Sequence, residues 1–173
     1  MINKNSITIH SDLLHAKEHL YDICNFEWTN LQKDKESAEY GAHSFQVNNQ
    51  SVLFRSAKIT PTKIGQFVTL WKRIDNGPIQ PFDVSDGINL FIISTRKDNR
   101  LGQFIFPKSV LHDKGIISTN NIGGKRAIRV YPPWDETLNK QAQKTQQWQL
   151  DYFLEIPIDK PIDKERAKML YDL

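Results

Sequence analysis

The chain must bury the nearly all-apolar stretch Leu90–Ser94. A run this short, rich in β-branched and aromatic residues and preceded by a loop with Gly77, Pro78 and Pro81, is typical of a strand buried on both faces. The turn-forming run Lys97–Arg100 follows it, and after that comes the strand-like run Gly102–Phe106. The sequence therefore predicts two adjacent strands in the interior of a sheet.

A hairpin is predicted earlier in the chain. Its two β-type runs are Ser44–Val47 and Ser51–Ile59, and the turn-rich trio Asn48–Gln50 separates them. A further strand is expected at Lys125–Tyr131, between a glycine-rich loop and the run Pro132–Trp134. Phe26–Tyr40 is interpreted as a polar connection.

Helices are predicted on either side of these strands. Ser11–Cys24 carries apolar residues at three- and four-residue steps, which is typical of a helix with one buried face. The other helices are expected at Pro107–Asp113, Asp135–Leu154 and Glu165–Leu173.

The stretch 61–73 admits two interpretations. A helix is favoured because Thr60 and Pro61 form a good helix start and because apolar residues recur at positions 64, 67, 68 and 71. A strand stays open, since Gly65 weakens a helix and Phe67–Trp71 is rich in strand formers.

Mixed helices and strands in 173 residues predict an α/β (α+β mixed) protein, a single domain with a central mixed sheet flanked by helices. We expect the domain to span residues 1–154. Residues 155–173 are interpreted as a proline-interrupted linker and a short C-terminal helix.

The composition predicts a cytoplasmic protein without a membrane partner. No apolar run approaches the roughly 20 residues that span a bilayer, and the N-terminal run Met1–Ser6 lacks the apolar core of a secretion signal. A single cysteine, Cys24, permits no internal disulfide, in agreement with a reducing compartment. It is interpreted as a core residue.

Positive charge is concentrated in two segments. The formal net charge is only +3, but Tyr40–Ile74 carries +5 and Arg96–Pro132 carries +6, whereas the segments on either side and between them are acidic. If the fold brings the two basic segments together, they form a basic face that suits a polyanionic partner.

One strand offers part of a nuclease motif. Many metal-dependent nucleases place an acid-x-Lys triplet on a strand, because carboxylates hold Mg²⁺ at the scissile phosphate and the lysine positions or activates water. Ser56-Ala57-Lys58 has the lysine and the spacing, with serine in place of the acid. Ser56, Lys58 and Glu39 are therefore the candidate catalytic residues, and Mg²⁺ or Mn²⁺ would be needed only for a nuclease.

Phosphate binding requires only cations and hydrogen-bond donors, with aromatic side chains for stacking on bases. Trp134 is expected to be exposed beside the two prolines. The candidate nucleic-acid-binding residues are Arg55, Lys58, Thr62, Lys63, Gln66, Lys72, Arg73, Lys125, Arg126, Arg129 and Trp134.

Blocks covering most of residues 39–153 resemble the MepB-like family of small bacterial proteins. They are Phe54-Arg55-x-Ala57 to Arg73, Gly102-Gln103-Phe104-x-Phe106-Pro107-Lys108, Gly124 to Trp134, and Thr145-Gln146-x-Trp148-Gln149. The resemblance implies a restriction-endonuclease-like core and nucleic-acid binding, with Lys58 at the position of a catalytic lysine. The serine at position 56 departs from the nuclease pattern.

Taken together, these features predict a nucleic-acid-binding protein that uses a basic face of an endonuclease-like fold and has lost its catalytic acid. DNA and RNA are both open as partners. The alternatives are a Mg²⁺- or Mn²⁺-dependent nuclease and a non-catalytic regulatory or small-ligand-binding protein.

Overall fold

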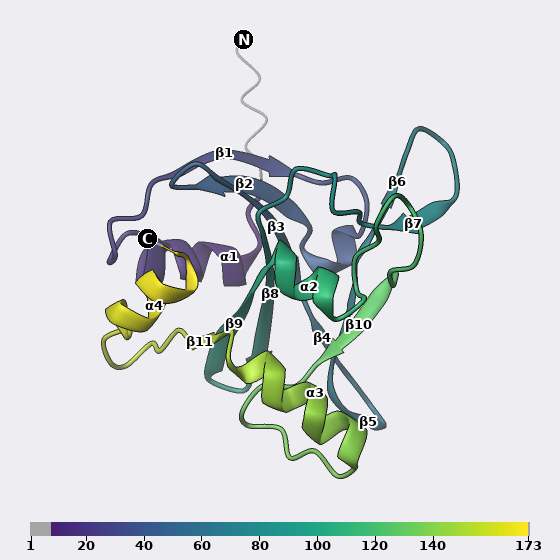
Figure 1. Ribbon diagram of the computed structural model, residues 1–173. Coiled ribbons are helices and arrows are strands. Elements are labelled where there is room, and N and C mark those ends of the chain that lie inside the picture. Colours follow the sequence, from purple (N-terminus) through teal and green to yellow (C-terminus); the bar gives the residue numbers. More distant parts are fainter. Residues whose placement is uncertain (1–7, 173) are drawn as a thin grey trace.

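The computed structural model describes residues 8–172 as a mixed α/β domain (Figure 1). The N-terminal run Met1–Ser6, considered above for a secretion signal, lies outside the described residues. The helices are α1 (Ser11–Ala16), α2 (Lys108–Asp113), α3 (Lys140–Leu150) and α4 (Lys164–Leu170). A π-helical turn, Lys17–Tyr21, continues α1.

The large sheet has the strand order β1-β2-β3-β8-β9-β11. The parallel pair β3–β8 lies at its centre, and the other neighbours pair antiparallel. The predicted hairpin and the two predicted interior strands therefore lie in one mixed sheet, but the run predicted as Ser51–Ile59 leaves this sheet after Ser56. Its strands are β1 (Trp28–Lys33), β2 (His43–Val47), β3 (Gln50–Ser56), β8 (Leu90–Lys97), β9 (Arg100–Pro107) and β11 (Phe153–Glu155).

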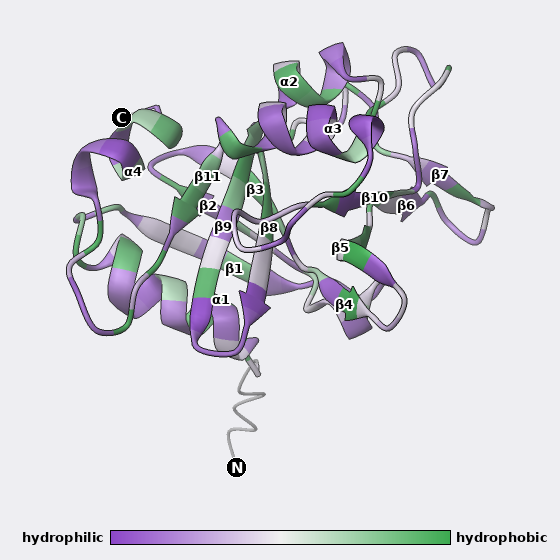
Figure 2. Ribbon diagram, turned by 90° about the horizontal axis from the view of Figure 1, so that it is seen from below, coloured by the Kyte–Doolittle hydropathy of each residue, from purple (hydrophilic) through white to green (hydrophobic). Residues whose placement is uncertain are grey.

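The large sheet is buried on both faces. Along β3 and β8, alternate side chains point to opposite sides, so that Phe54 and Ile92 lie in one core and Leu53, Phe91 and Ile93 in the other. This double burial explains why the run Leu90–Ser94 is apolar without alternation. Figure 2 shows the sheet between α1 on one side and α2 with α3 on the other.

The first face is covered by α1 and by the C-terminal segment. Leu170 and Tyr171 lie in the same core as Leu13. The Tyr171 hydroxyl donates to Gln103 Oε1 at 2.9 Å and lies 2.9 Å from the Tyr21 hydroxyl, and burial raises the pKa of Tyr21 to about 12. The short C-terminal helix is present as α4, and residues 156–171 contribute to the core of the domain.

The second face carries a smaller sheet with the order β10-β5-β4, together with α2 and α3. Its strands are β4 (Lys58–Thr60), β5 (Lys63–Thr69) and β10 (Ala127–Val130). This sheet joins residues from the two basic segments, because β10 pairs with β5 over Ala127–Val130 and Gln66–Thr69. A two-stranded ribbon, β6 (Trp71–Arg73) and β7 (Ile79–Pro81), projects from it.

The helix favoured for residues 61–73 is wrong, and the strand interpretation is confirmed. β5 and β6 occupy this stretch. Gly65 has φ +82°, a conformation outside a right-handed helix, and the pairing of β5 with β4 shifts register next to it. The β-branched and aromatic residues that follow Gly65 form a strand whose Val68 is fully buried.

Two other elements differ from the expectation. The helix predicted for 135–154 begins at Lys140, because the Asn139 side chain caps it by accepting a hydrogen bond from the Ala142 N–H. It ends at Leu150, and Phe153–Glu155 joins the large sheet as β11. The stretch expected to be a polar connection contains β1, an edge strand with largely exposed side chains.

No helix within residues 8–172 combines the length and apolar character needed to cross a bilayer. The mixed α/β class and the central mixed sheet are as predicted. A restriction-endonuclease-like core stays a prediction.

Candidate nucleic-acid interface

A cavity of about 520 Å³ lies between α3 and the β10–β5 pair. Four cationic residues line it: Lys63, Lys114, Lys125 and Arg129. No Asp or Glu is among its lining residues. We call this cavity the basic groove. Uncompensated cations around a concave site create a positive potential that attracts anions.

Strand β10 places one set of side chains in the basic groove and the other in the core. Ala127, Arg129 and Tyr131 line the groove, in the alternate positions expected of a strand. Ile128 and Val130 are buried with the second core, although Ile128 also borders the cavity. The alternating pattern of this segment therefore separates a ligand-facing side from a packing side.

Arg129 is held in place by the neighbouring strands. Its guanidinium donates to Thr60 Oγ1 at 3.0 Å and to the carbonyl of Gly65 at 3.3 Å. It also lies over the ring of Phe67, 6.0 Å from the ring centre. These contacts fix the guanidinium at the groove before any ligand arrives.

Glutamine side chains of α3 form hydrogen bonds to the backbone of β10 and of the residues that follow it. Gln149 is 1% exposed, and its amide both accepts from the Tyr131 N–H and donates to the Arg129 carbonyl. Gln146 donates to the carbonyls of Pro132 and Asp135. Although α3 is polar, it packs against the small sheet. Its glutamine side chains make the backbone hydrogen bonds that a further strand beside β10 would otherwise make.

Gly65 brings the opposite wall of the groove close to Tyr131. A Cβ atom built on Gly65 would lie 2.7 Å from two carbons of the Tyr131 ring, which is too short for a real contact. Together with the φ of +82°, this approach requires glycine at position 65.

Lys114 and Trp148 line the basic groove and were not among the predicted binding residues. Lys114 follows α2, and its ammonium lies 5.3 Å from the centre of the Trp148 ring. Trp148 also packs on Phe106, 5.4 Å between ring centres. A signal for Trp148 was present, since it belongs to the block Thr145–Gln149, but the placement of Lys114 depends on the tertiary fold.

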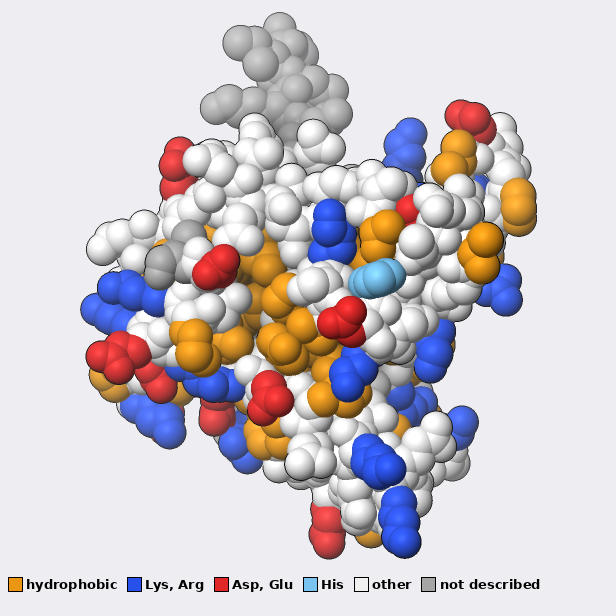
Figure 3. Space-filling model, in the orientation of Figure 1, with side chains coloured by type: hydrophobic (Ala, Val, Ile, Leu, Met, Phe, Trp, Pro, Cys, Tyr) orange, Lys and Arg blue, Asp and Glu red, His pale blue; other side chains and the backbone are white. Residues whose placement is uncertain are grey.

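The positive charge extends beyond the basic groove. Figure 3 shows Lys and Arg side chains gathered at the lower right, over α3 and beside β10. Lys58, Arg126, Lys140 and Lys144 are exposed near the groove or on its flanking elements. Lys58 faces Phe67 in the strand register, and Phe67 in turn faces Arg129. The predicted residues Lys58, Lys63, Arg126, Lys125 and Arg129 are thus brought to one side of the molecule, where Thr62 lies in the exposed β4–β5 turn.

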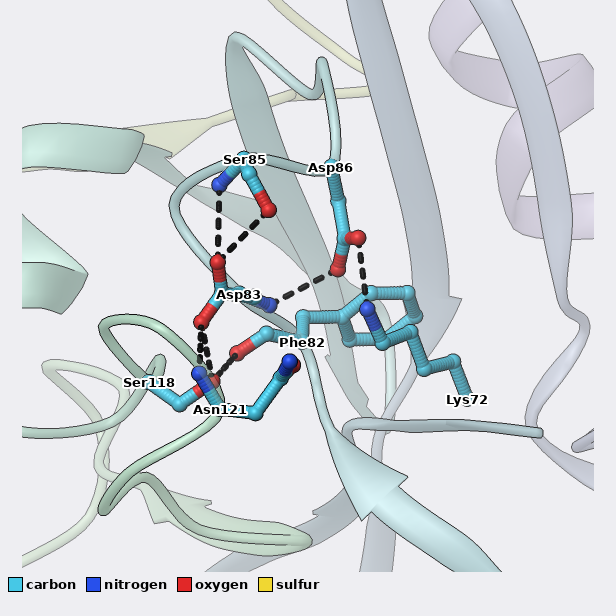
Figure 4. Close-up of polar contacts among 7 residues, drawn as sticks. All are labelled: Lys72, Phe82, Asp83, Ser85, Asp86, Ser118 and Asn121. Carbon is cyan, nitrogen blue, oxygen red and sulfur yellow. Dashed lines mark hydrogen bonds and ion pairs between the residues drawn. The ribbon is translucent and has the colours of Figure 1, made fainter. Parts of the chain in front are cut away.

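Lys72 is instead part of a polar cluster centred on Asp83 (Figure 4). Its ammonium pairs with Asp86 at 2.5 Å, and the other Asp86 oxygen accepts from the Asp83 N–H at 2.7 Å. The Asp83 carboxylate accepts from the Ser118 hydroxyl at 2.7 Å and from the Asn121 N–H at 2.9 Å. The cluster ties two loops together and fixes the segment that leads to Lys125.

Hydrogen bonds to its charged form hold the pKa of Asp83 well below its usual range. The strongest cause is the Ser118 hydroxyl, followed by the Ser85 hydroxyl and the Asn121 N–H. Asp83 is 2% exposed, and both of its carboxylate oxygens accept hydrogen bonds from these donors. It therefore acts as a structural anchor.

Three of the predicted binding residues, Arg55, Gln66 and Trp134, are not among the residues that line the basic groove. Arg55 is 2% exposed and pairs with Asp34 at 3.2 Å. Gln66 is 1% exposed and donates to a backbone carbonyl.

The indole of Trp134 packs edge-on against Phe153 and under the Arg100 guanidinium, with its N–H buried. Arg73 lies on the projecting ribbon, where it stacks on Trp71 and pairs with Glu36. The sequence shows that these side chains are polar or aromatic. It does not show what they contact, because the partners come from distant segments.

The three candidate catalytic residues lie on three different elements: Ser56 ends β3, Lys58 begins β4, and Glu39 lies in a 3₁₀ turn. The Ser56 hydroxyl donates to Asp12 at 3.4 Å, and Asp12 pairs with Arg96 at 2.7 Å. The Lys58 ammonium lies 4.7 Å from the centre of the Tyr40 ring.

Glu39 is exposed in a 3₁₀ turn at Ala38–Tyr40. Within residues 8–172, no group of three or more His, Cys, Asp or Glu side chains is arranged to hold a metal ion. Cys24 is buried and free, as predicted for a core cysteine.

The fold and the groove define a class of protein: a mixed α/β domain in which a glutamine-rich helix and a small sheet enclose a basic cavity. The MepB-like family model matches residues 34–155, and the chain belongs to this family. A solved structure described as the crystal structure of MepB is similar, with 37% identity, a TM-score of 0.73, and coverage of 84% of this chain and 97% of that one. A search of curated proteins finds no match.

Proposed function

We propose that this chain binds nucleic acid, DNA or RNA, through the basic groove and the cations around it. The observation that carries the proposal is the lining of the groove, in which four cations meet no carboxylate. The formal net charge of the whole chain is only +3, so the positive charge at the groove is a local feature and not a consequence of a generally basic protein.

A polymer is favoured over a small anion because the basic surface is larger than the cavity. Lys58 and Arg126 flank the groove, and Lys140 and Lys144 extend it along α3. Hydroxyl and amide side chains at Thr62 and along α3 add neutral donors for phosphate oxygens. A nucleic-acid ligand also agrees with a cytoplasmic location, which we propose with it.

The alternative of a Mg²⁺- or Mn²⁺-dependent nuclease gains no support from the contacts of Lys58. Its ammonium faces an aromatic ring, and within residues 8–172 no ion pair joins it to a carboxylate. The residue two positions before it, Ser56, bonds to an aspartate that is already paired with an arginine.

The test is binding of a fluorescent random-sequence nucleic acid, measured by anisotropy between about 50 and about 200 mM salt. The groove variant combines Lys63→Ala, Lys114→Ala and Lys125→Ala. All three lysines are exposed and make no ion pair within the described part of the chain, so their removal should leave the fold intact. We expect weaker binding and a salt slope that is smaller by about 2, because each phosphate contact contributes about 0.7 to 0.9.

A matched control removes the same charge elsewhere. Lys33→Ala, Lys160→Ala and Lys168→Ala replace exposed lysines on β1, the C-terminal segment and α4. This variant should keep the wild-type slope within about 0.5. A wild-type protein whose binding does not change with salt, or two variants with equal losses, would contradict the proposal.

A further inference from the structure

The basic groove continues past Trp148. A second cavity of about 550 Å³ shares Lys114, Gln141, Thr145 and Trp148 with the groove and adds Lys144, Gln147 and Asp151, so it is less positive than the groove. The two cavities therefore follow α3 on either side of the tryptophan. An extended ligand lying along α3 passes directly over this ring.

Aromatic side chains are concentrated on the walls of the groove. Phe67 and Tyr131 come from the small sheet, and Trp148 comes from α3. Each ring is half-buried, so part of its surface remains open to a ligand. Nucleic-acid bases stack on such rings regardless of their identity, because every base has a π-face.

The charges and the helix end supply phosphate sites next to these rings. The N-terminal turn of α3 borders the groove through Asn139, Gln141 and Ala142. The Ala142 N–H is capped by Asn139, and the positive end of the helix dipole at this turn favours anions. Lys63 and Lys125 line the same cavity from the sheet side. Cationic and aromatic side chains therefore line the same cavity.

A duplex does not suit this arrangement. Proteins that read duplexes insert a protruding helix or ribbon into a groove of the nucleic acid, and the bases of a duplex are stacked on one another. Here the basic surface is hollow, with the aromatic rings inside it. Only a base that has left its stack can reach them.

We infer that the ligand of the basic groove is a single-stranded nucleic acid, one base of which enters the cavity and stacks on the ring of Trp148. The inference rests on the proposed function and narrows it. The phosphates on either side of that base lie on the lysines of the groove and at the start of α3.

The test compares three probes of about 12 nucleotides, a length within the usual site sizes for single strands. They are a random-sequence DNA strand, its blunt duplex, and a strand of the same length without bases, which keeps the phosphates. All three are measured with the wild-type protein at the same low salt. We expect the single strand to bind tighter than the duplex, and about 5- to 100-fold tighter than the strand without bases, as expected for stacking of one base.

Each result has a separate meaning. If none of the probes binds in a salt-sensitive way, the proposed function itself fails. If the duplex binds as tightly as the single strand, nucleic-acid binding stands and the single-strand inference is overturned. If the strand without bases binds as tightly as the normal strand, the insertion of a base is overturned.

A variant locates the stacking. Trp148→Leu should lose most of the preference for the normal strand over the strand without bases. Trp71→Leu, a half-buried tryptophan on the projecting ribbon, is the control and should keep that preference. Equal preferences in the two variants would overturn the role of Trp148.

Discussion

The side-chain oxygen of Gln149 accepts a hydrogen bond from the backbone N–H of Tyr131 at 2.9 Å. Its amide nitrogen donates to the carbonyl two residues earlier in β10, that of Arg129, at 3.1 Å. One glutamine thus supplies both bonds that a neighbouring strand would give to this edge. This contact sets the position of α3 against the small sheet and so shapes the basic groove.

Gln149→Ala should destabilise the fold by about 2 to 4 kcal/mol, because two buried backbone groups lose their partners. Urea unfolding measures the change. Gln147→Ala, on the exposed side of the same helix, should stay within about 0.5 kcal/mol of the wild type. A Gln149 variant as stable as the Gln147 variant would show that the two bonds contribute nothing.

Gly65→Ala should destabilise the protein by more than the cost of its backbone conformation. A left-handed residue with a Cβ costs about 1 to 2 kcal/mol, and at this site the new atom also meets the Tyr131 ring. Gly87 has φ +71° with nothing within 4 Å of a built Cβ, so Gly87→Ala isolates the backbone cost. Unfolding free energies for the two variants should differ, and equal values would argue against the close approach to Tyr131.

Much of the large sheet follows from local patterns. Leu90–Ser94 and the hairpins are predictable because burial on both faces demands continuous apolar runs and because turn residues separate them. The stretch 61–73 fits a helix by periodicity and a strand by residue type, and the strand β5 is stabilised by pairing with β10, more than fifty residues away. Strand β11 could not be predicted for the same reason, since it forms by pairing with β9, which is distant in the sequence.

The site was predictable in part. Charge segmentation predicted a basic face if the fold brought Tyr40–Ile74 and Arg96–Pro132 together, and β5 and β10, one from each segment, do pair. Sequence could not show that Arg55 is buried against Asp34, since that aspartate lies on a segment with no pattern of its own. Nor could it reveal Lys114, whose place at the groove depends on how α2 meets α3.

Acid should weaken the fold through Asp83. A carboxyl whose pKa is lower in the folded than in the unfolded chain stabilises the fold above its unfolded-state pKa, and this contribution is lost as the pH falls through the folded-state pKa. Asp83→Asn should therefore lower the urea midpoint near neutral pH and flatten its decline below about pH 4.

The control for this prediction is Asp98→Asn, an exposed residue in the β8–β9 turn whose φ of +53° asparagine also tolerates. Its urea midpoints should follow those of the wild type at each pH. An Asp83 variant whose midpoints also follow the wild type would contradict the anchoring role of this carboxylate.

The central claim is that a nucleic-acid strand lies in the basic groove, and photo-cross-linking tests it most directly. A single strand carrying 5-iodouracil is bound to the wild-type protein and irradiated, and the cross-linked peptides are identified by mass spectrometry. The account predicts cross-links to Trp148 or Tyr131, the aromatic residues of α3 and the end of β10. Cross-links confined to the β6–β7 ribbon or to α4 would contradict it.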